Sequence, residues 1–394
     1  MADDRIRVAM LHGPGRPDHD GVSDYVDHLL VALAEVDVEA TAVAVRPGGR
    51  GSSVRWLAAT VQAAREVRRL RPDLVHVQFA PSAYRFSGLP GLLPLRLPRD
   101  IPLVTTLHEY GWWAAPGWLP ARCWSPVERA RLWDRETGRL VPASAAVVVT
   151  NGGHGTAVRD RTGVTPVHIP IAPNVTDHSG ATSAGWRLRE ELGLSEGAPL
   201  LAFFGFVHPV KGLRYLIEAL PELHRAYPDL RLLVVGGFTS QALPEAEARA
   251  YRAELDELAR RCAVADVVTF AGHLPAERVS AALHAADMVV LPFTAGVSTK
   301  SGALLTALAH GVPTAATVPD PGDDEPHRNG AVAVIRHRRD SAAIVSAVGR
   351  LLADPVLRRR LAERGRAFVA PYSWPRVAGA HRDLYRRVLG RHGG

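Results

Sequence analysis

The 394-residue chain has little cysteine and no long hydrophobic run. Its 2 cysteines, Cys123 and Cys262, lie far apart and lack the spacing of metal ligands. A disulfide framework is therefore not expected, and a cytoplasmic location is the default expectation. No apolar run approaches the ~18 residues of a membrane-spanning helix, and the first residues are acidic where a signal peptide would be basic.

Acidic residues are outnumbered by basic ones. The chain has 47 Lys plus Arg against 40 Asp plus Glu, a net charge of +7, and nearly all of the positive charge is arginine. Such a surplus suits nucleic acid, an anionic membrane surface or a phosphate-bearing small ligand. The arginine clusters at 65–71 and 358–366 follow amphipathic helix patterns without interleaved aromatics or a zinc signature. We therefore expect solvated helix faces there and no nucleic-acid partner.

Short apolar runs alternate with longer periodic segments along most of the chain, which predicts parallel sheets covered by helices. The expected strands of the first half are 6–11, 74–79, 103–107 and 145–150, with a helix over 23–35. The expected strands of the second half are 200–204, 230–235, 267–270, 288–292 and 314–317. Its expected helices are 213–224, 245–261, 279–285 and 302–309.

The length and the two series together predict an α/β protein of two doubly wound domains. We place them at 1–175 and 197–371, with a polar linker over 176–196 and a C-terminal helical segment over 372–394. Ligands of such sheets bind outside the carboxyl ends of the strands, at the point where the strand order reverses. A cleft between the two domains is the expected site.

The first segment that suggests chemistry is 203–212, which reads Phe-Phe-Gly-Phe-Val-His-Pro-Val-Lys-Gly. A strand ends there, a turn with glycine and proline follows, and Lys211 stands at the entrance of a helix. Helix N-termini attract anions through their unbonded N–H groups and the helix dipole, and a lysine adds a full charge. The segment indicates a diphosphate site, and an ordinary turn with a surface lysine is an equal alternative.

The second segment is 291–313, where small hydroxyl residues and glycine from Ser298 to Gly302 open a helix that His310-Gly311 ends. Such a start exposes several backbone donors to an anion, and Lys300 supplies charge. The segment indicates a cradle for phosphate and sugar. A plain helix cap with Lys300 in solvent is the alternative.

Together the two segments resemble glycosyltransferase family 4, whose members have the GT-B fold of two Rossmann-like domains facing a cleft. Lys211-Gly212 matches the pair that opens a helix of the second domain, and 306–313 matches the frame that ends the family's Glu-x7-Glu motif. Further resemblance lies in the glycine loop at 21–25, in His108-Glu109, which resembles the family's His-Asp pair, in the base-contacting segment at 270–274 and in the Tyr-Ser-Trp at 372–374. The last precedes a terminal helix that in this family usually crosses back onto the first domain. The resemblance runs from about Val8 to Leu389.

The sequence departs from the family at both glutamates, where Ser298 and Thr306 stand instead. In the usual member the first glutamate contacts hydroxyls of the donor sugar and the second contacts the ribose. Neutral hydroxyls still form hydrogen bonds, but weaker ones than charged acceptors. The familiar arginine before the Lys-Gly pair is replaced by Phe206, with His208 nearby as a donor to phosphate if protonated, and Lys300 as a substitute charge.

Three further side chains follow strands of the first domain and are interpreted as the acceptor side: His12, Gln78 and Trp112. His12 opens a glycine- and proline-rich loop over 12–21, and a loop folded over its own tryptophans is the alternative to a role for Trp112. His108 ends another strand, where it can donate to a sugar hydroxyl or bond to neighbouring backbone.

The resemblance implies a retaining transfer from a UDP- or GDP-sugar to a hydroxyl-bearing small-molecule, glycan or lipid-linked acceptor. It implies no obligatory metal and no cofactor beyond the nucleotide-sugar cosubstrate. The expected catalytic residues are His108, Lys211 and Lys300. The expected donor contacts are Gly21, Gly205, His208, Lys211, Leu274, Ser298, Thr299, Lys300, Ser301, Gly302 and Thr306.

Three other interpretations stay open. One is a nucleotide-sugar epimerase of the same fold, although the scarcity of acidic groups around the sugar site counts against it. Another is a non-catalytic member that binds a partner, which the two missing glutamates suggest. The third is a lipid-acceptor transferase attached peripherally to the inner face of a membrane, through the basic helix at 55–71 and the apolar run at 89–97.

Overall fold

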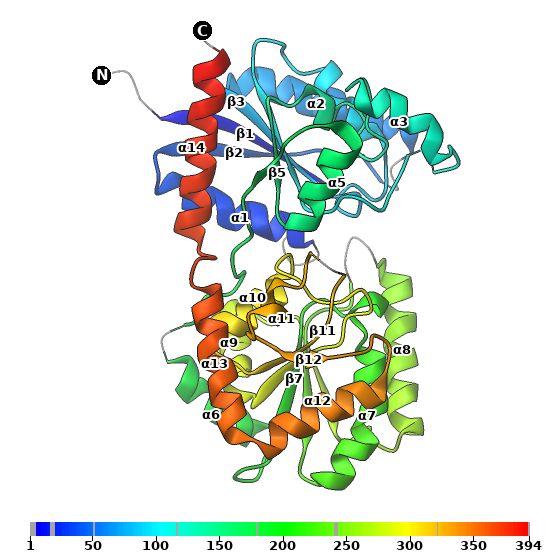
Figure 1. The fold of residues 1–394 in the computed structure, drawn as a ribbon, viewed down its shortest axis with the longest axis vertical. Coiled ribbons are helices and arrows are strands. Elements are labelled where there is room, and N and C mark those ends of the chain that lie inside the picture. The colour runs from blue at the N-terminus through cyan, green and yellow to red at the C-terminus, as the bar shows by residue number, and fades with distance from the viewer. Residues whose placement is uncertain are drawn as a thin grey trace. The chain divides into compact units, whose positions relative to one another are not determined.

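The structure is a computed structural model that describes residues 5–15, 20–49, 52–115, 117–178, 180–239, 243–320 and 322–392. The chain forms two compact units (Figure 1). Unit 1 comprises Met1–Ile171 and Trp374–Gly394, and unit 2 comprises Ala172–Ser373. The chain thus leaves unit 1, builds unit 2 and returns to unit 1 with its last helix.

Unit 1 is built on a parallel sheet of six strands in the order β2-β1-β3-β4-β5-β6. The strands are β1 Ile6–His12, β2 Val38–Ala44, β3 Leu74–Phe79, β4 Leu103–Leu107, β5 Ala146–Val149 and β6 Val167–His168. The helices are α1 Gly21–Ala34, α2 Ser53–Leu70, the 3₁₀ helix η1 Leu89–Leu95, α3 Ala121–Arg129, α4 Leu140–Ala143, α5 Gly152–Thr162 and α14 Trp374–His392.

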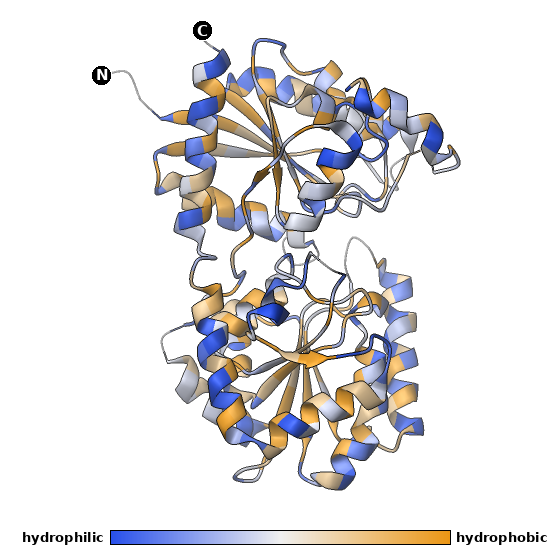
Figure 2. Cartoon of the chain, viewed as in Figure 1, coloured by the Kyte–Doolittle hydropathy of each residue, from blue (hydrophilic) through white to orange (hydrophobic). Residues whose placement is uncertain are grey.

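Helices cover the sheet of unit 1, so its central strands have almost no solvent-facing side. All residues of β3 and β4 are buried, as expected for parallel strands covered on both faces. Figure 2 shows the strands of both sheets as mostly hydrophobic and the helices as two-faced. Helix α14 packs on α1, where the Trp374 ring stacks on His28 with centroids 5.2 Å apart and meets Tyr25 at 5.3 Å.

Unit 2 also has a parallel sheet of six strands, in the order β12-β11-β10-β7-β8-β9. The strands are β7 Leu200–Phe204, β8 Arg231–Val235, β9 Val268–Gly272, β10 Met288–Leu291, β11 Thr314–Thr317 and β12 Ala333–Ile335. The helices are α6 Ala181–Glu191, the 3₁₀ helix η2 Pro209–Lys211, α7 Leu213–Ala226, α8 Glu245–Arg261, α9 Ala276–Ala285, α10 Gly302–Ala309, α11 Glu325–Arg328, α12 Ser341–Ala353 and α13 Pro355–Val369.

Each sheet has one place where the strand order reverses. In unit 1 it lies between β1 and β3, and in unit 2 between β7 and β10. The turns that leave the two strands at such a point go to opposite faces of the sheet, which leaves room for a ligand at the carboxyl ends. These two places are therefore the first positions to search for a site.

The polar stretch expected to be a linker differs from the expectation, because 181–191 forms helix α6. This helix packs against α9 through Ala181, Gly185 and Leu188, which are its buried residues. A Cβ atom at Gly185 would lie 2.9 Å from the backbone nitrogen of Ala285, so the two helices approach closely because this residue is glycine. The polar remainder of α6 faces solvent and concealed the helix in the sequence.

The apolar run at 89–97 mostly belongs to the core rather than to the surface. Leu93 and Leu97 are buried, whereas Leu95 is exposed, and the 3₁₀ helix η1 packs on α2. In the part of the chain that the structure describes, every helix is too short or too polar to cross a membrane.

Candidate active site

The turn after β7 carries Lys211 at the carboxyl edge of the second sheet. His208 starts the 3₁₀ helix η2, and its Nδ1 accepts a hydrogen bond of 3.2 Å from the N–H of Val210. Because Nδ1 accepts, a ring proton lies on Nε2. Gly212 then adopts a φ of 70°, a left-handed conformation that favours glycine, and α7 begins at the next residue.

The turn after β10 lies against the turn after β7. The N–H of Thr294 donates to Val210 O over 2.9 Å, and a Cβ atom at Gly212 would lie 2.0 Å from Pro292 O. The Lys211 ammonium lies 3.8 Å from the centre of the Phe293 ring. The two turns, each found separately in the sequence, therefore meet at the point where the strand order reverses.

Helix α10 begins beside these turns. The Ser301 hydroxyl caps it by accepting from the N–H of Leu304 over 3.3 Å. The N–H groups of Gly302 and Ala303 make no hydrogen bond within the described residues, as expected for a first helical turn. A Cβ atom at Gly205, which follows β7 with a φ of 120°, would lie 3.4 Å from the Ala303 Cβ. The helix start therefore faces the end of β7.

Ser298 and Thr306, which stand where the family has glutamates, are both buried. Thr306 is 0% exposed and Ser298 is 3% exposed. Neither hydroxyl oxygen has a hydrogen-bond partner in the described part of the chain. A buried hydroxyl without a hydrogen-bond partner costs free energy in the folded protein.

The remaining expected donor contacts surround the same edge or lie beyond it. Thr299 is buried next to Ser298, Lys300 is exposed, and Leu274 follows β9 with its side chain half-buried. Lys211 and Lys300 are the only lysines in the whole chain. Each lysine belongs to a different sequence motif, and the structure places the two turns that carry them after the neighbouring strands β7 and β10.

In unit 1, His108 immediately follows β4 and bonds to another predicted site residue. Its Nε2 lies 2.8 Å from Oε1 of Gln78, whose side chain is 0% exposed. Gln78 was predicted to border the acceptor, but in this structure it contacts His108 and the protein interior. Burial lowers the pKa of His108 to about 3, with a smaller effect from His381, so the ring is neutral.

The other predicted residues of unit 1 occupy separate places. His12 ends β1, is buried and lies 3.5 Å from the Ser23 hydroxyl through Nδ1. Burial lowers its pKa, and nearby Asp20 opposes the effect. Gly21 opens α1 behind the cap Asp20, and residues 16–19 of the predicted loop lie outside the described ranges.

Trp112 is 61% exposed and meets Phe86 edge to face, with centroids 6.0 Å apart. Trp113 lies 6.5 Å from the same phenylalanine. An exposed aromatic surface of this kind suits the apolar face of a sugar or another flat group. The two tryptophans follow β4, on the same loop as His108, whereas Phe86 precedes η1.

A buried ion cluster anchors this loop. Arg161 on α5 bonds to the carboxylates of Glu128, Asp134 and Glu136, which are at most 1% exposed. Glu136 in turn accepts from the N–H of Gly111 over 2.9 Å, two residues before Trp113. Burial raises the pKa of Glu136, and the Arg161 guanidinium opposes that rise. The cluster was not found in the sequence, because its members are spread from 111 to 161.

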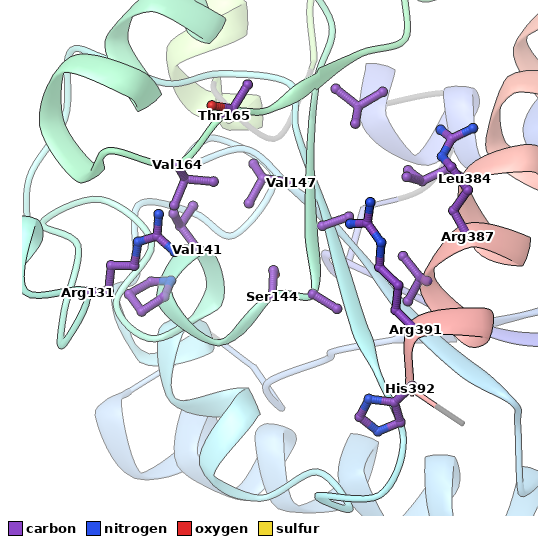
Figure 3. A pocket seen from close by; sticks show the side chains of 15 residues that line it. Arg131, Val141, Ser144, Val147, Val164, Thr165, Leu384, Arg387, Arg391 and His392 are labelled. Carbon is purple, nitrogen blue, oxygen red and sulfur yellow. The ribbon is translucent and has the colours of Figure 1, made fainter. Parts of the chain in front are cut away.

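A hollow in unit 1 lies away from these residues. Figure 3 shows it between the start of β5, the start of β6 and the last turns of α14, lined by Val147, Val164, Arg387 and Arg391. In a parallel sheet the strand starts lie at the edge opposite the strand ends. This hollow is therefore separate from His12 and His108, which end β1 and follow β4.

Two doubly wound parallel sheets, one in each unit, match the architecture of the GT-B class of glycosyltransferases. Residues 19–179 match the family model described as Glycosyltransferase Family 4, and residues 185–368 match that of Glycosyl transferases group 1. The chain is 30% identical over 430 residues to a D-inositol 3-phosphate glycosyltransferase of Nocardia farcinica, across 98% of this chain and 88% of that protein. The chain belongs to glycosyltransferase family 4.

Other relatives agree with this assignment. A glycogen synthase of Mycobacterium tuberculosis is 28% identical over 320 residues, across 81% of this chain and 69% of that protein. Sucrose-phosphate synthase from Thermosynechococcus elongatus shares the fold with a TM-score of 0.74 at 20% identity, across 98% of this chain and 100% of that one. HepE of Anabaena, solved with UDP and glucose, has a TM-score of 0.69 at 16% identity, across 97% of this chain and 100% of that one. The predicted GT-B fold, family and enzyme class are confirmed, which favours the transferase over an epimerase or a non-catalytic binder.

Proposed function

We propose that this transferase binds the diphosphate of a UDP- or GDP-sugar between the turns that carry Lys211 and Lys300. The observation that carries the proposal is the placement of lysine. Among 47 basic residues only these two are lysines, and both follow strands that pair with each other at the reversal point of the sheet. A compact ammonium with three rotatable donors fits between phosphate oxygens and backbone amides.

Backbone amides complete the proposed phosphate site. The N–H groups of Gly302 and Ala303 at the start of α10 have no described acceptor, and the positive end of the helix dipole lies at the same place. Gly205 has no side chain and so leaves space in front of Ala303. Its φ of 120° would strain any other residue at this position. Ser298 and Thr306 supply neutral hydroxyls to the sugar and the ribose, in place of the usual carboxylates.

The chemistry follows from where charge develops. As the bond between the anomeric carbon and the phosphate oxygen breaks, the departing diphosphate gains negative charge, which Lys211, Lys300 and the helix amides stabilise. The acceptor hydroxyl attacks from the side of the leaving group, its oxygen bonds to the anomeric carbon, and its proton passes to the departing phosphate oxygen. The configuration of the sugar is retained, and the charge balance of this step requires no metal ion.

We assign the acceptor to residues of unit 1. His108 and His12 are neutral polar groups at the carboxyl ends of β4 and β1, which β3 separates, and Trp112 offers an exposed aromatic face. By name, relatives of similar identity act on different acceptors, an inositol phosphate in one case and glycogen in another. The shared chemistry is a hydroxyl-bearing acceptor, and that is the class we propose.

A thermal-shift panel of UDP- and GDP-sugars tests the donor site. A ligand present at about 100 times its Kd stabilises a protein by ~2.7 kcal/mol. We expect stabilisation by at least one nucleotide sugar and its loss in the Lys211→Ala, Lys300→Ala double variant. Stabilisation that persists in the double variant, or its absence with every nucleotide sugar of the panel, would contradict the proposed site.

Peripheral membrane contact is a separate part of the proposal. Helix α2 presents exposed arginines at 55, 65, 68 and 69. Leu95 is exposed on η1, the helix that packs on α2. Such a surface is attracted to anionic lipid. Sedimentation with anionic liposomes at low salt should carry the protein down, and an Arg65→Glu, Arg69→Glu variant should remain in solution. Absence of binding by the unmodified protein removes this part.

A further inference from the structure

A continuous chain of hydrogen bonds runs through the interior of unit 1, from helix α14 to the end of β4. Oη of Tyr385 lies 2.7 Å from Nδ1 of His76 on β3. Nε2 of His76 lies 2.7 Å from the Thr106 hydroxyl and 3.3 Å from the amide nitrogen of Gln78. Oε1 of Gln78 then lies 2.8 Å from Nε2 of His108. The last contact joins two residues that were predicted from the sequence to belong to the site, Gln78 and His108.

The interior members of this chain are fully buried, which keeps the imidazoles neutral. His76, Gln78, Thr106 and Tyr385 are all 0% exposed. Burial holds the pKa of His76 well below its usual value, and nearby imidazoles lower it further. A neutral imidazole has one N–H donor and one lone pair, so each hydrogen bond decides which nitrogen carries the proton.

The orientation of the Gln78 amide determines which ring nitrogen of His108 carries the proton. The amide nitrogen of Gln78 donates one hydrogen to Sδ of Met10 over 3.1 Å and the other to Nε2 of His76, so both of its hydrogens are used. Its oxygen, which can only accept, faces His108. His108 therefore donates from Nε2 and keeps its lone pair on Nδ1, which has no hydrogen-bond partner among the described residues.

The orientation of the Gln78 amide is determined in turn by the protonation of His76. Nε2 of His76 accepts from the Gln78 amide and the Thr106 hydroxyl, so His76 carries its proton on Nδ1 and donates it to Oη of Tyr385. Tyr385 belongs to the last helix of the chain, 309 residues beyond His76. Docking of α14 thus fixes His76, and His76 fixes the direction in which the Gln78 amide points.

We propose that Gln78 is a positioning residue of the transferase, which holds His108 as the neutral tautomer with its proton on Nε2. His108 then presents a hydrogen-bond acceptor at Nδ1 to a hydroxyl of the reacting sugars. A neutral acceptor also avoids placing a cation beside a sugar that becomes oxocarbenium-like. The inference rests on the proposed place of His108 at the reacting sugars, and it adds what orients this ring.

The tautomer can be measured directly by nitrogen NMR on the full-length enzyme labelled with ¹⁵N-histidine. The His108 signals are identified by their loss in a His108→Gln variant. Around neutral pH we expect a protonated Nε2 and an unprotonated Nδ1 in the unmodified enzyme. Gln78→Met keeps the length of the side chain but removes the acceptor oxygen, so the single tautomer should give way to a mixture.

Two variants serve as controls. Gln78→Glu keeps an acceptor oxygen and adds a charge, so it should keep the proton on Nε2 and raise the pKa of His108. Met10→Leu removes only the sulfur contact of the Gln78 amide and should leave the tautomer unchanged. If Gln78→Met does not fold, Gln78→Glu still decides the matter. A proton on Nδ1 in the unmodified enzyme, or an unmoved pKa in Gln78→Glu, overturns the proposal.

Kinetics separate this inference from the proposed function. With a donor identified, Gln78→Met should lower kcat by about tenfold, the equivalent of ~1.4 kcal/mol and of one hydrogen bond, with little change in the donor KM. Gln78→Glu should restore part of the rate. If the tautomer is as expected but His108→Gln transfers sugar at the normal rate, the proposed role of His108 fails while the orientation by Gln78 stands.

Discussion

The ammonium of Lys211 lies 3.8 Å from the centre of the Phe293 ring, which joins the turn after β7 to the turn after β10. A cation over an aromatic face is attracted to it by about 0.5 to 2 kcal/mol. Phe293 is buried, so its ring is a fixed platform for a side chain with four rotatable bonds. The lysine is therefore held at the reversal point of the sheet by a contact within the protein, as its proposed role as an electrostatic catalyst requires.

The first prediction concerns this lysine. Lys211→Ala should lower the transfer rate at saturating donor by about two orders of magnitude, the usual effect of losing one donor to a developing anion. Arg214→Ala is the matched control, because Arg214 lies three residues further on and pairs with Glu254 on α8 at 3.1 Å. The control should retain its rate. Equal rates for Lys211→Ala and the unmodified enzyme would exclude the proposed role.

The second prediction concerns the buried hydroxyl of Thr306. Thr306→Val keeps the shape of the side chain and removes a polar atom without a described partner, so unit 2 should become more stable by about 1 kcal/mol. The same change should weaken donor binding. Hydrogen exchange of peptides from β10 and β11 measures the first effect, and donor titration measures the second.

Thr314→Val is the control for this pair of measurements. The Thr314 hydroxyl is equally buried but donates to Val312 O over 2.9 Å, so its removal should destabilise unit 2 and spare donor binding. A Thr306→Val variant that loses stability and binds donor normally would show that this hydroxyl serves the fold.

The third prediction concerns the ion cluster below the loop after β4. Arg161→Met leaves three buried carboxylates without their shared cation, so unit 1 should lose about 3 kcal/mol or more of stability. Arg159→Met, on the same helix, changes an exposed arginine whose side chain bonds to the Thr156 hydroxyl over 3.1 Å, and should change stability by less than about 0.5 kcal/mol. Hydrogen exchange of peptides covering β4 and β5 reports both. Similar losses in the two variants would contradict the assignment of the cluster.

The fourth prediction is a loss of stability in acid. Burial lowers the pKa of His381 to about 4 and that of His108 to about 3, whereas an unfolded histidine titrates near ~6.5. The unfolded chain therefore binds more protons below pH ~6.5, and unit 1 should lose up to ~1.4 kcal/mol per pH unit for each such histidine as the pH falls. His381→Gln should reduce this slope. Identical slopes with and without His381 would mean that its folded pKa is not lowered.

Much of the fold follows from local pattern. The bounds of β3, β4, β7, α8, α10 and β11 agree with those expected from apolar runs and helical spacing, because these elements are either fully buried or strongly two-faced. The short strands β6 and β12 were not predicted, since 2 and 3 residues carry no periodic signal. Helix α6 was missed because its buried face is built from small residues.

The site could be predicted less completely. Lys211 and the start of α10 could be recognised from turn and cap residues, because these residues act locally. The contact of Lys211 with Phe293 and that of Tyr385 with His76 depend on strand order and on the return of α14, which local sequence does not encode. Gln78 was assigned to the acceptor because it ends a strand, but its direction was settled by a helix at the other end of the chain.

The proposed diphosphate site can be observed directly, because the chain contains only two lysines. Reductive ¹³C-methylation preserves their charge and gives one NMR signal for each dimethyl-lysine, besides that of the terminal amine. A titration with UDP, and another with GDP, should move both lysine signals with one common Kd for the nucleotide that binds. Binding detected by calorimetry while both lysine signals stay in place would contradict the account.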